Sequence, residues 1–488
     1  MTLLNELPWW RVGVKYPEIK NWIGGEFVES PGPTAEVLSP LDGSELSRVP
    51  LSVAEDVDNA VQKATQAFAD WSKRTIKQRS QVAYRYRELL LKHKDELSQL
   101  IHEEHGKTIE EAQAELVRAI EVTEFACSLP QLAAGEVLEV SRGVECRVDR
   151  VQLGVVASIV PFNFPMMVPH WTIPIALILG NAMVFKPSEK VPLSSNRVAE
   201  LLAEAGLPPG VFNVVHGERP VVEAICDHPG IGAVTFVGST HVAKSVYMRA
   251  TSHLKRALCL GGAKNHLIVL SDAPVEQTAE NVVSSMAGCA GQRCMAAASM
   301  VALPETEAII EQVCAEARRM IPGETLGPVI SIEAKTRIEN YITEAEQAGA
   351  KVLVDGRGTI VKGRENGFYV GATVIDHVTP DMKIAQEEAF GPVLAIIRAN
   401  SVEEALTIEN SSPYGNAAAV YTRNGGQARE ITERASAGMI GINVGVPVPV
   451  EPFGFGGWNA SKFGVGDITG KSSLEFWTRS KKTTTRWY

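Results

Sequence analysis

Apolar residues recur with helical and strand-like periods in an ordered way along this chain. A short strand-like stretch at 21–30 (NWIGGEFVES) precedes a segment with the three- and four-residue spacing of an amphipathic helix. Ser52 and Glu55 have the S-x-x-E spacing of a capping box, which predicts where this helix begins. Two further helices are expected over 77–105 and 108–128. The apolar positions of the first helix are Val57, Ala60, Val61, Ala64, Phe68 and Trp71.

The pattern changes to a two-residue period near residue 136. Apolar and polar side chains alternate up to about residue 152, and the residues from there to 160 are nearly all apolar. The alternation predicts an exposed two-stranded ribbon, and the apolar run predicts a buried strand. The closing segment 471–488 (KSSLEFWTRSKKTTTRWY) is also strand-like, and it is more apolar than a solvated end. We predict that it pairs with the ribbon at 136–150, in the same subunit or in a partner.

Short apolar runs alternate with helical segments through the rest of the chain. Continuous apolar runs joined by helices are typical of parallel sheets with helices on both faces. The sequence therefore predicts an α/β fold with two doubly wound α/β domains plus a small β-ribbon arm. The first series of candidate strands is 154–160, 181–186, 211–217, 233–239 and 264–270, with crossover helices at 194–206 and 241–253. The second series is 298–303, 351–356, 369–375, 393–399, 416–422 and 438–443.

Composition narrows the class of protein. The 488 residues carry a net charge of −10 and contain no long Lys/Arg run, so we expect neither a nucleic-acid partner nor a membrane-surface partner. Residues 1–20 match neither a signal peptide nor a transit peptide, and no apolar run approaches the roughly 18 residues of a membrane span. We therefore expect a cytoplasmic protein. The seven cysteines are odd in number and lack metal-ligand spacing, which predicts reduced thiols and no metal site.

Cys294 lies in the stretch Gly291-Gln292-Arg293-Cys294-Met295, among small residues. Two interpretations are open from this stretch. The cysteine is either a small apolar side chain that fills a tight contact, or a thiolate that acts as a nucleophile. Other motifs must decide between them.

Two predicted strand ends offer contacts for a nucleotide, although the usual G-x-G-x-x-G motif is absent. Lys186 and Glu189 follow one strand at the edge where α/β sheets bind ligands, and a carboxylate there can accept hydrogen bonds from both ribose hydroxyls. The alternative is a solvated polar turn. Gly238 and Ser239 join another strand to a helix that Ser239 is placed to cap, and the first backbone N–H groups of this helix can hold a phosphate. Most such joints, however, bind nothing.

Asn163 lies in the turn Pro161-Phe162-Asn163-Phe164-Pro165, after a third strand. Prolines at 161, 165 and 169 predict a rigid, non-helical backbone. The amide of Asn163 can donate to a developing oxyanion, or it can satisfy a carbonyl of the turn. A thiolate, an amide donor and a nicotinamide that accepts hydride are the parts of covalent aldehyde oxidation.

Five ordered motifs resemble the aldehyde dehydrogenase family over almost the entire chain: PFNFP at 161–165, FKPSE at 185–189, FVGST at 236–240, Cys294, and EEAFGPV at 387–393. The resemblance implies that Cys294 is the nucleophile, Asn163 the oxyanion donor and NAD the cofactor. It also implies an NAD-binding domain at 1–135 and 152–260, a catalytic domain at 261–445, and an oligomerisation arm at 136–151 and 470–488. A homodimer or homotetramer is expected.

The same resemblance implies the contacts with NAD. Glu388 and Phe390 would position the nicotinamide ribose and ring, whereas Glu387 is expected to be structural. The expected cofactor-binding residues are Pro161, Phe162, Lys186, Ser188, Glu189, Gly238, Ser239, Glu388 and Phe390.

Within the family, the chain is most similar to the CoA-acylating branch, that of the methylmalonate-semialdehyde dehydrogenases. The similarity includes EEHGKT at 103–108, GAKNH at 262–266, GQRCMA at 291–296 and EFWTRSKK at 475–482. This branch converts malonate semialdehyde or its 2-methyl form, with NAD and CoA, to acetyl-CoA or propionyl-CoA, NADH and carbon dioxide. Hydrolytic members have a water-activating glutamate in the motif ELGGK, and Leu260 stands in its place and cannot accept a proton. We therefore expect CoA as co-substrate; the alternative is hydrolysis of another small or acidic aldehyde to the free acid.

A semialdehyde that carries a carboxylate is best matched by a planar guanidinium. Arg293 precedes the nucleophile, and Arg118 matches a second arginine that the family places near the aldehyde. The alternative for Arg118 is a surface ion pair with glutamates on its own helix. Phe164 and Phe453 are expected to line the aldehyde tunnel. A catalytically silent protein on this scaffold is a third possibility, against which the joint presence of Cys294, Asn163 and Glu388 argues.

Overall fold

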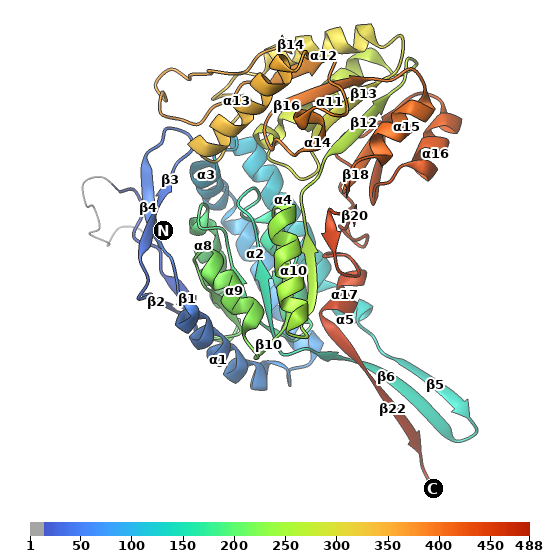
Figure 1. Cartoon of the computed structure of the whole chain (residues 1–488). Coiled ribbons are helices and arrows are strands. Elements are labelled where there is room, and N and C mark those ends of the chain that lie inside the picture. Colours follow the sequence, from blue (N-terminus) through green and yellow to red (C-terminus); the bar gives the residue numbers. More distant parts are fainter. Residues whose placement is uncertain (1–13) are drawn as a thin grey trace.

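The computed structural model describes residues 14–488, so the part of the first predicted domain at 1–13, and most of the segment analysed for a targeting signal, lie outside the described residues. Two open α/β sheets form the body, and a three-stranded arm projects away from it (Figure 1). This is the α/β architecture that the sequence predicts. The division into an NAD-binding domain and a catalytic domain remains a prediction, which the two separate sheets support.

The first sheet has the strand order β2-β1-β9-β8-β7-β10-β11-β21, and its five central strands from β9 to β11 are parallel. The hairpin β1–β2 and the short β21 close its edges in antiparallel pairing. The strands are β1 (Asn21–Ile23), β2 (Glu26–Val28), β7 (Val155–Ile159), β8 (Ala182–Lys186), β9 (Phe212–Val214), β10 (Ile231–Val237), β11 (Arg256–Leu260) and β21 (Lys462–Phe463).

One strand of the first predicted series was assigned to the wrong sheet. Residues 264–270 form β12 (Asn265–Val269), which pairs with β13 and β18 in the second sheet. The fifth parallel strand of the first sheet is instead β11, which the sequence pattern did not predict.

Helices cover both faces of the first sheet, because alternate residues of its buried strands point to opposite sides. Val155, Ala157 and Ile159 of β7 pack with α1, α9 and α10, whereas Val156 packs with α2, α4, α7 and α8. The first group is α1 (Ala54–Trp71), α9 (Arg219–Asp227) and α10 (Thr240–Ser252). The second group is α2 (Ile76–Lys92), α4 (Ile109–Cys127), α7 (Ile173–Ile178) and α8 (Pro192–Glu204).

Two expectations for the N-terminal helices are wrong in detail. The predicted helix 77–105 is broken at His93 (φ −101°, ψ 20°) into α2 and α3 (Lys94–His105). The first helix is capped by Asp56, whose carboxylate accepts the backbone N–H of Val53 at 2.9 Å, and not by Ser52 with Glu55. The Ser52 hydroxyl instead exchanges hydrogen bonds with the side chain of Asn21.

The second sheet has the order β14-β15-β16-β13-β12-β18-β19 and is parallel except for β14. All six strands of the second predicted series lie in it. They are β13 (Ala297–Ala302), β14 (Lys351–Val354), β15 (Thr373–Asp376), β16 (Val393–Arg398), β18 (Ala417–Tyr421) and β19 (Met439–Ile442). Its helices include α11 (Val275–Ala287), α12 (Glu307–Arg319), α13 (Ile332–Gln347), α14 (Lys383–Gln386), α15 (Val402–Asn410) and α16 (Gly425–Arg434).

The arm consists of β5 (Glu136–Ser141), β6 (Val144–Gln152) and β22 (Thr478–Arg486) in the order β22-β6-β5. The predicted pairing of the closing segment with the ribbon is confirmed within one chain, because β22 runs antiparallel to β6 over its whole length. The closing segment is not a strand throughout, since its first part forms α17 (Ser472–Phe476).

Candidate active site

Cys294 lies between the short 3₁₀ turn η1 (Gly288–Gly291) and β13, where the two sheets meet. Its backbone carbonyl accepts hydrogen bonds from the side-chain amides of Asn265 and Asn416, both at 2.9 Å. A Cβ at Gly291 would lie 2.0 Å from the carbonyl oxygen of Gly391, so only glycine fits there. The loop is therefore held by contacts to the second sheet, and Cys294 stays partly exposed.

The structure brings Asn163 to the cysteine loop. Asn163 is 5% exposed, and its side-chain Nδ2 donates to the carbonyl of Gln292 at 2.9 Å, two residues before Cys294. One N–H of the amide is engaged in this bond. Gln292, which the sequence did not single out, is fully buried and accepts the backbone N–H of Ile330 at 2.9 Å.

Electrostatics hold the proton on the sulfur of Cys294. Burial among apolar neighbours, followed by the negative charge of Glu388, raises the pKa of the Cys294 thiol to about 12. Burial raises the pKa of Glu388 to about 7, against the opposing effects of the Ala263 N–H and the Lys264 ammonium. Burial lowers the pKa of Lys264 to about 8. A carboxyl group with a pKa near neutral thus acts on the candidate nucleophile, and Lys264 in turn acts on that carboxyl group.

Leu260 ends β11 and packs into the same apolar cluster as Cys294 and Met295. Its neighbour Cys259 faces the opposite side of the sheet. Neither position supplies a carboxylate to the space next to Cys294. The carboxylate that acts on the thiol comes instead from Glu388 on the second sheet's side.

A cavity of about 550 Å³ opens at the carboxyl ends of β7, β8 and β10. Parallel strands place their carboxyl ends at one edge, which explains why motifs far apart in sequence meet there. Lys186 Nζ lies 3.3 Å from the Glu189 carboxylate, and burial lowers the pKa of Lys186. Six of the nine expected cofactor residues line the cavity: Pro161, Phe162, Lys186, Ser188, Glu189 and Gly238.

Two details of these turns differ from the expectations. Ser239 is the N-cap residue of α10, but its hydroxyl makes no capping hydrogen bond. Pro169 does not lie in an extended turn, because α6 (Met167–His170) includes it in its first turn, where proline is tolerated. The rigid non-helical segment therefore ends near Met166.

Phe390 is connected to the cavity through Phe162. The two rings meet edge to face, with centroids 5.9 Å apart and planes at 88°. Phe390 has a left-handed backbone (φ 52°), a strained conformation for an aromatic residue that surrounding contacts must hold. Glu388 lies against the 261–264 loop, so closely that a Cβ at Gly262 would come within 2.5 Å of its carboxylate.

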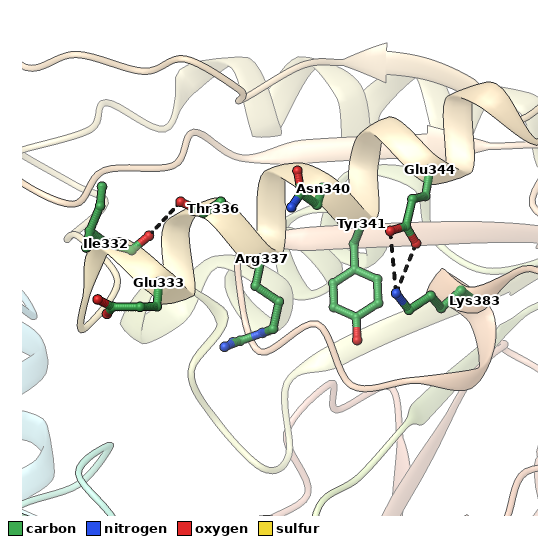
Figure 2. A pocket seen from close by; sticks show the side chains of 8 residues that line it. All are labelled: Ile332, Glu333, Thr336, Arg337, Asn340, Tyr341, Glu344 and Lys383. Carbon is green, nitrogen blue, oxygen red and sulfur yellow. Dashed lines mark hydrogen bonds and ion pairs between the residues drawn. The ribbon is translucent and has the colours of Figure 1, made fainter.

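Helix α13 contacts residues 387–389, which include Glu388, and lines a surface groove of about 530 Å³ (Figure 2). Tyr341 donates to the Glu387 carboxylate at 2.5 Å, and Arg337 donates to the Ala389 carbonyl at 3.3 Å. Figure 2 shows both side chains leaving α13 on the groove side, with Lys383 reaching the Glu344 carboxylate. The groove contains no residue expected at the site, but its contacts fix the backbone on both sides of Glu388.

Both candidate substrate arginines are paired with carboxylates of α4. Arg118 lies 2.7 Å from Glu121 and its side chain is 41% exposed, which is the surface contact that the alternative interpretation predicts. Arg293 lies 3.6 Å from Glu111, and its Nε donates to the sulfur of Cys289 at 3.3 Å.

The two candidate tunnel residues differ in their surroundings. The ring of Phe164 lies 4.2 Å from the Lys107 ammonium, and it packs against the apolar cluster of Cys294. Phe453 is 72% exposed. Within residues 14–488, no three His, Cys, Asp or Glu side chains are grouped as metal ligands, and no helix is long and apolar enough to cross a membrane.

Comparison with known proteins gives one consistent set of relatives. Residues 27–483 match the model of the aldehyde dehydrogenase family. Malonate-semialdehyde dehydrogenase 1 of Geobacillus kaustophilus is 45% identical over 476 residues, which cover 96% of this chain and 97% of the relative.

Two solved structures superpose on almost the full chain. One, from Oceanimonas doudoroffii, is a methylmalonate-semialdehyde dehydrogenase, with a TM-score of 0.95, 39% identity and coverage of 97% of this chain and 99% of the other. The second, a Sinorhizobium meliloti protein assigned to the same activity and complexed with NAD, has a TM-score of 0.95, 40% identity and coverage of 97% and 98%.

Proposed function

We propose, since this chain belongs to the aldehyde dehydrogenase family, that it oxidises malonate semialdehyde or methylmalonate semialdehyde with NAD and transfers the acyl group to CoA. Together with the loss of carbon dioxide, the reaction gives acetyl-CoA or propionyl-CoA. The observation that supports the proposal most directly is the hydrogen bond from the Asn163 amide to the carbonyl of Gln292, two residues before Cys294. Phe162, the neighbour of Asn163, lines a cavity of nucleotide size.

Cys294 attacks the aldehyde carbon as the thiolate, whose proton is released to solvent, and the second N–H of the Asn163 amide donates to the oxygen that becomes negative. The first N–H is fixed on the carbonyl of Gln292, so the amide needs no reorientation as charge develops. NAD, when bound, supplies the acceptor for the hydride that leaves this carbon. Cys294 then carries a thioester.

The residues of the cavity fit NAD. Glu189 can accept hydrogen bonds from ribose hydroxyls, and Lys186 holds that carboxylate in place. The first backbone N–H groups of α10 are free of a capping hydroxyl at Ser239 and can bind a phosphate. The Phe390 ring contacts Phe162, which lines the cavity, and the Glu388 charge acts on Cys294. In this proposal the two residues position the nicotinamide ring and ribose.

The fate of the thioester follows from the residues around it. Leu260 stands where hydrolytic members have a glutamate, and it lies in the apolar cluster against which Cys294 packs, so no base activates water from that position. The thioester then persists until the CoA thiol attacks it. Arg118 and Arg293 bind the substrate carboxylate in this proposal, each by exchanging a glutamate of α4 for the substrate. Phe164 and Phe453 line the approach.

A second candidate function is hydrolysis of a small or acidic aldehyde to the free acid. The observation that favours it is the carboxylate of Glu388, whose charge raises the pKa of Cys294. Its own pKa of about 7 suits a general base.

An assay of purified protein with malonate semialdehyde and NAD, with and without CoA, separates the two functions. Acylation predicts that CoA is required for sustained NADH formation and that acetyl-CoA is the product. Free acid formed at full rate without CoA would establish hydrolysis instead. Cys294→Ala, which removes the nucleophile, should abolish NADH formation in either case while NAD still binds.

We also propose that the arms of neighbouring chains pair to form a homodimer or homotetramer. β5 leaves three apolar side chains largely exposed, Val137 at 63%, Leu138 at 67% and Val140 at 53%, which favours burial in a partner contact. A reducing, cytoplasmic compartment is supported by the seven cysteines, none of which forms a disulfide.

A further inference from the structure

Lys107 and Glu115 form a fully buried ion pair next to the turn that carries Asn163. Both side chains are 0% exposed, and Lys107 Nζ lies 2.5 Å from Glu115 Oε2. Gly106, in a left-handed conformation (φ 89°), ends α3 and turns the chain so that Lys107 points inward. A Cβ at Gly106 would lie 2.5 Å from Pro328, so the turn depends on glycine.

This pair holds the Asn163 turn on both sides. Lys107 Nζ donates to the backbone carbonyl of Asn163 at 3.0 Å and lies 4.2 Å from the Phe164 ring. The other carboxylate oxygen of Glu115 accepts the backbone N–H groups of Met166 at 2.7 Å and Met167 at 3.0 Å. The peptide before Phe164 and the start of α6 are thereby fixed to α4.

Stability alone is a poor explanation for such a pair. Removing two charges from water is costly, and apolar residues of similar volume often stabilise a protein equally well. A directed ionic contact does what an apolar contact cannot, because it fixes the orientation of the peptide that it binds. Here that peptide belongs to the residue whose side chain must point at the reacting oxygen.

We propose that Lys107 and Glu115 are positioning residues that orient the Asn163 amide for the oxyanion. The inference rests on the proposed function, in which Asn163 donates to that oxygen. Lys107 fixes the main chain of Asn163, and the Gln292 carbonyl fixes one N–H of its side chain. The second N–H then has one direction available, toward the substrate at Cys294.

The test compares Lys107→Met, Asn163→Ala and the double variant Lys107→Met/Glu115→Gln. The double variant removes the bond to the Asn163 carbonyl without leaving a buried charge, and glutamine keeps a carbonyl oxygen for Met166 and Met167. It therefore covers the case in which Lys107→Met fails to fold. The readout is the pre-steady-state burst of NADH at saturating substrate and NAD, which reports formation of the thioester.

Loss of an oxyanion donor typically costs about 10²–10³-fold, and a small misplacement costs up to about 10²-fold. We expect Asn163→Ala to slow the burst by about 10²-fold and the double variant by about tenfold or more, with the KM for NAD unchanged within about twofold. Lys107→Met in the Asn163→Ala background should add little, because the donor that it orients is gone.

Two control variants separate positioning from general damage. Glu104→Gln changes a buried carboxylate of the same segment, which accepts the backbone N–H groups of Leu193 and Ser194 at the start of α8. This variant should raise the KM for NAD and leave the burst rate at saturating NAD unchanged. Asp376→Asn weakens the ion pair of the buried Asp376 carboxylate with the partly exposed Arg398 in the second sheet. It should lower the melting temperature without slowing the burst.

A folded double variant with a wild-type burst, beside a slow Asn163→Ala, would overturn the positioning role and leave the proposed function intact. A wild-type burst from Asn163→Ala would show that this amide is not the oxyanion donor, and the positioning role would then fail while the oxidation itself stands. Absence of an NADH burst from the wild-type protein would instead overturn the proposed function. Additive losses in the combined variant would also overturn the proposal, since they mean that Lys107 acts independently of Asn163.

Discussion

Replacing Glu388 by glutamine tests how its charge controls the nucleophile. Burial is the largest cause of the raised Cys294 pKa, and the Glu388 carboxylate is the second. An unperturbed thiol with a pKa of about 8.5 is about one quarter ionised at pH 8, whereas a pKa of about 12 leaves about 10⁻⁴ ionised. The free protein should therefore react with a thiol reagent about 10³-fold more slowly than an exposed cysteine.

Glutamine keeps the shape of the side chain but removes its charge, so the Cys294 pKa should fall. A fall of one pKa unit corresponds to about 1.4 kcal/mol and to about tenfold faster reaction at pH 8. The gain should be present above pH 7 and vanish below it, because Glu388 itself has a pKa of about 7 and becomes neutral in the wild type.

The assay is the rate of modification by a thiosulfonate reagent between pH 6 and 10 without NAD, with Cys294→Ala giving the background of the other thiols. Glu387→Gln is the matched control, since the Glu387 carboxylate is held by Tyr341 and should leave the profile unchanged. A wild-type midpoint below pH 9, or identical profiles for the wild type and Glu388→Gln, would refute the electrostatic argument.

Three further substitutions test the proposed contacts. Glu189→Gln should raise the KM for NAD about tenfold with little change in kcat, because charge-assisted hydrogen bonds worth about 1.5–3 kcal/mol are weakened; an unchanged KM in NAD titrations would make Glu189 a structural turn residue. Arg118→Gln should raise the KM for malonate semialdehyde by at least about tenfold and leave propanal oxidation unchanged. Equal effects on both substrates would show that Arg118 does not bind the substrate carboxylate and makes only a surface ion pair with Glu121. Leu260→Glu should produce free acid without CoA, detected by chromatography of the products, since it places a carboxylate in the cluster beside Cys294. Absence of free acid in a folded variant would show that a base at this position cannot reach the thioester.

The elements of the two sheets were largely predictable, because buried parallel strands are continuous apolar runs. The pattern reports burial but not the partner strand, which is why residues 264–270 were assigned to the first sheet although β12 belongs to the second. β11 was missed because it begins with the partly buried Arg256 and therefore does not start as an apolar run. The break at His93 was missed because α2 and α3 are both amphipathic and follow each other without a gap.

The gathering of the cofactor residues was also predictable, since strand ends of a parallel sheet meet at one edge. The surroundings of each side chain were not. Arg118 and Arg293 both lie beside glutamates of α4, and no spacing in the sequence distinguishes such a pair from a free guanidinium. Arg337 and Tyr341 support the Glu388 segment from a helix about 50 residues earlier, a contact that exists only in the folded chain.

Residues 104–107 belong to the motif EEHGKT, which resembles the family but whose role was not evident from the sequence. Glu104 holds the start of α8, which follows the Lys186–Glu189 turn, and Lys107 holds the Asn163 turn. His105, fully buried between them, stacks on Phe162 at 6.1 Å between ring centroids. One buried segment thus holds both the start of α8 and the Asn163 turn. Because charged groups buried this deeply are costly unless they are paired, the contacts of Glu104 and Lys107 constrain the local sequence there more than helix propensity does.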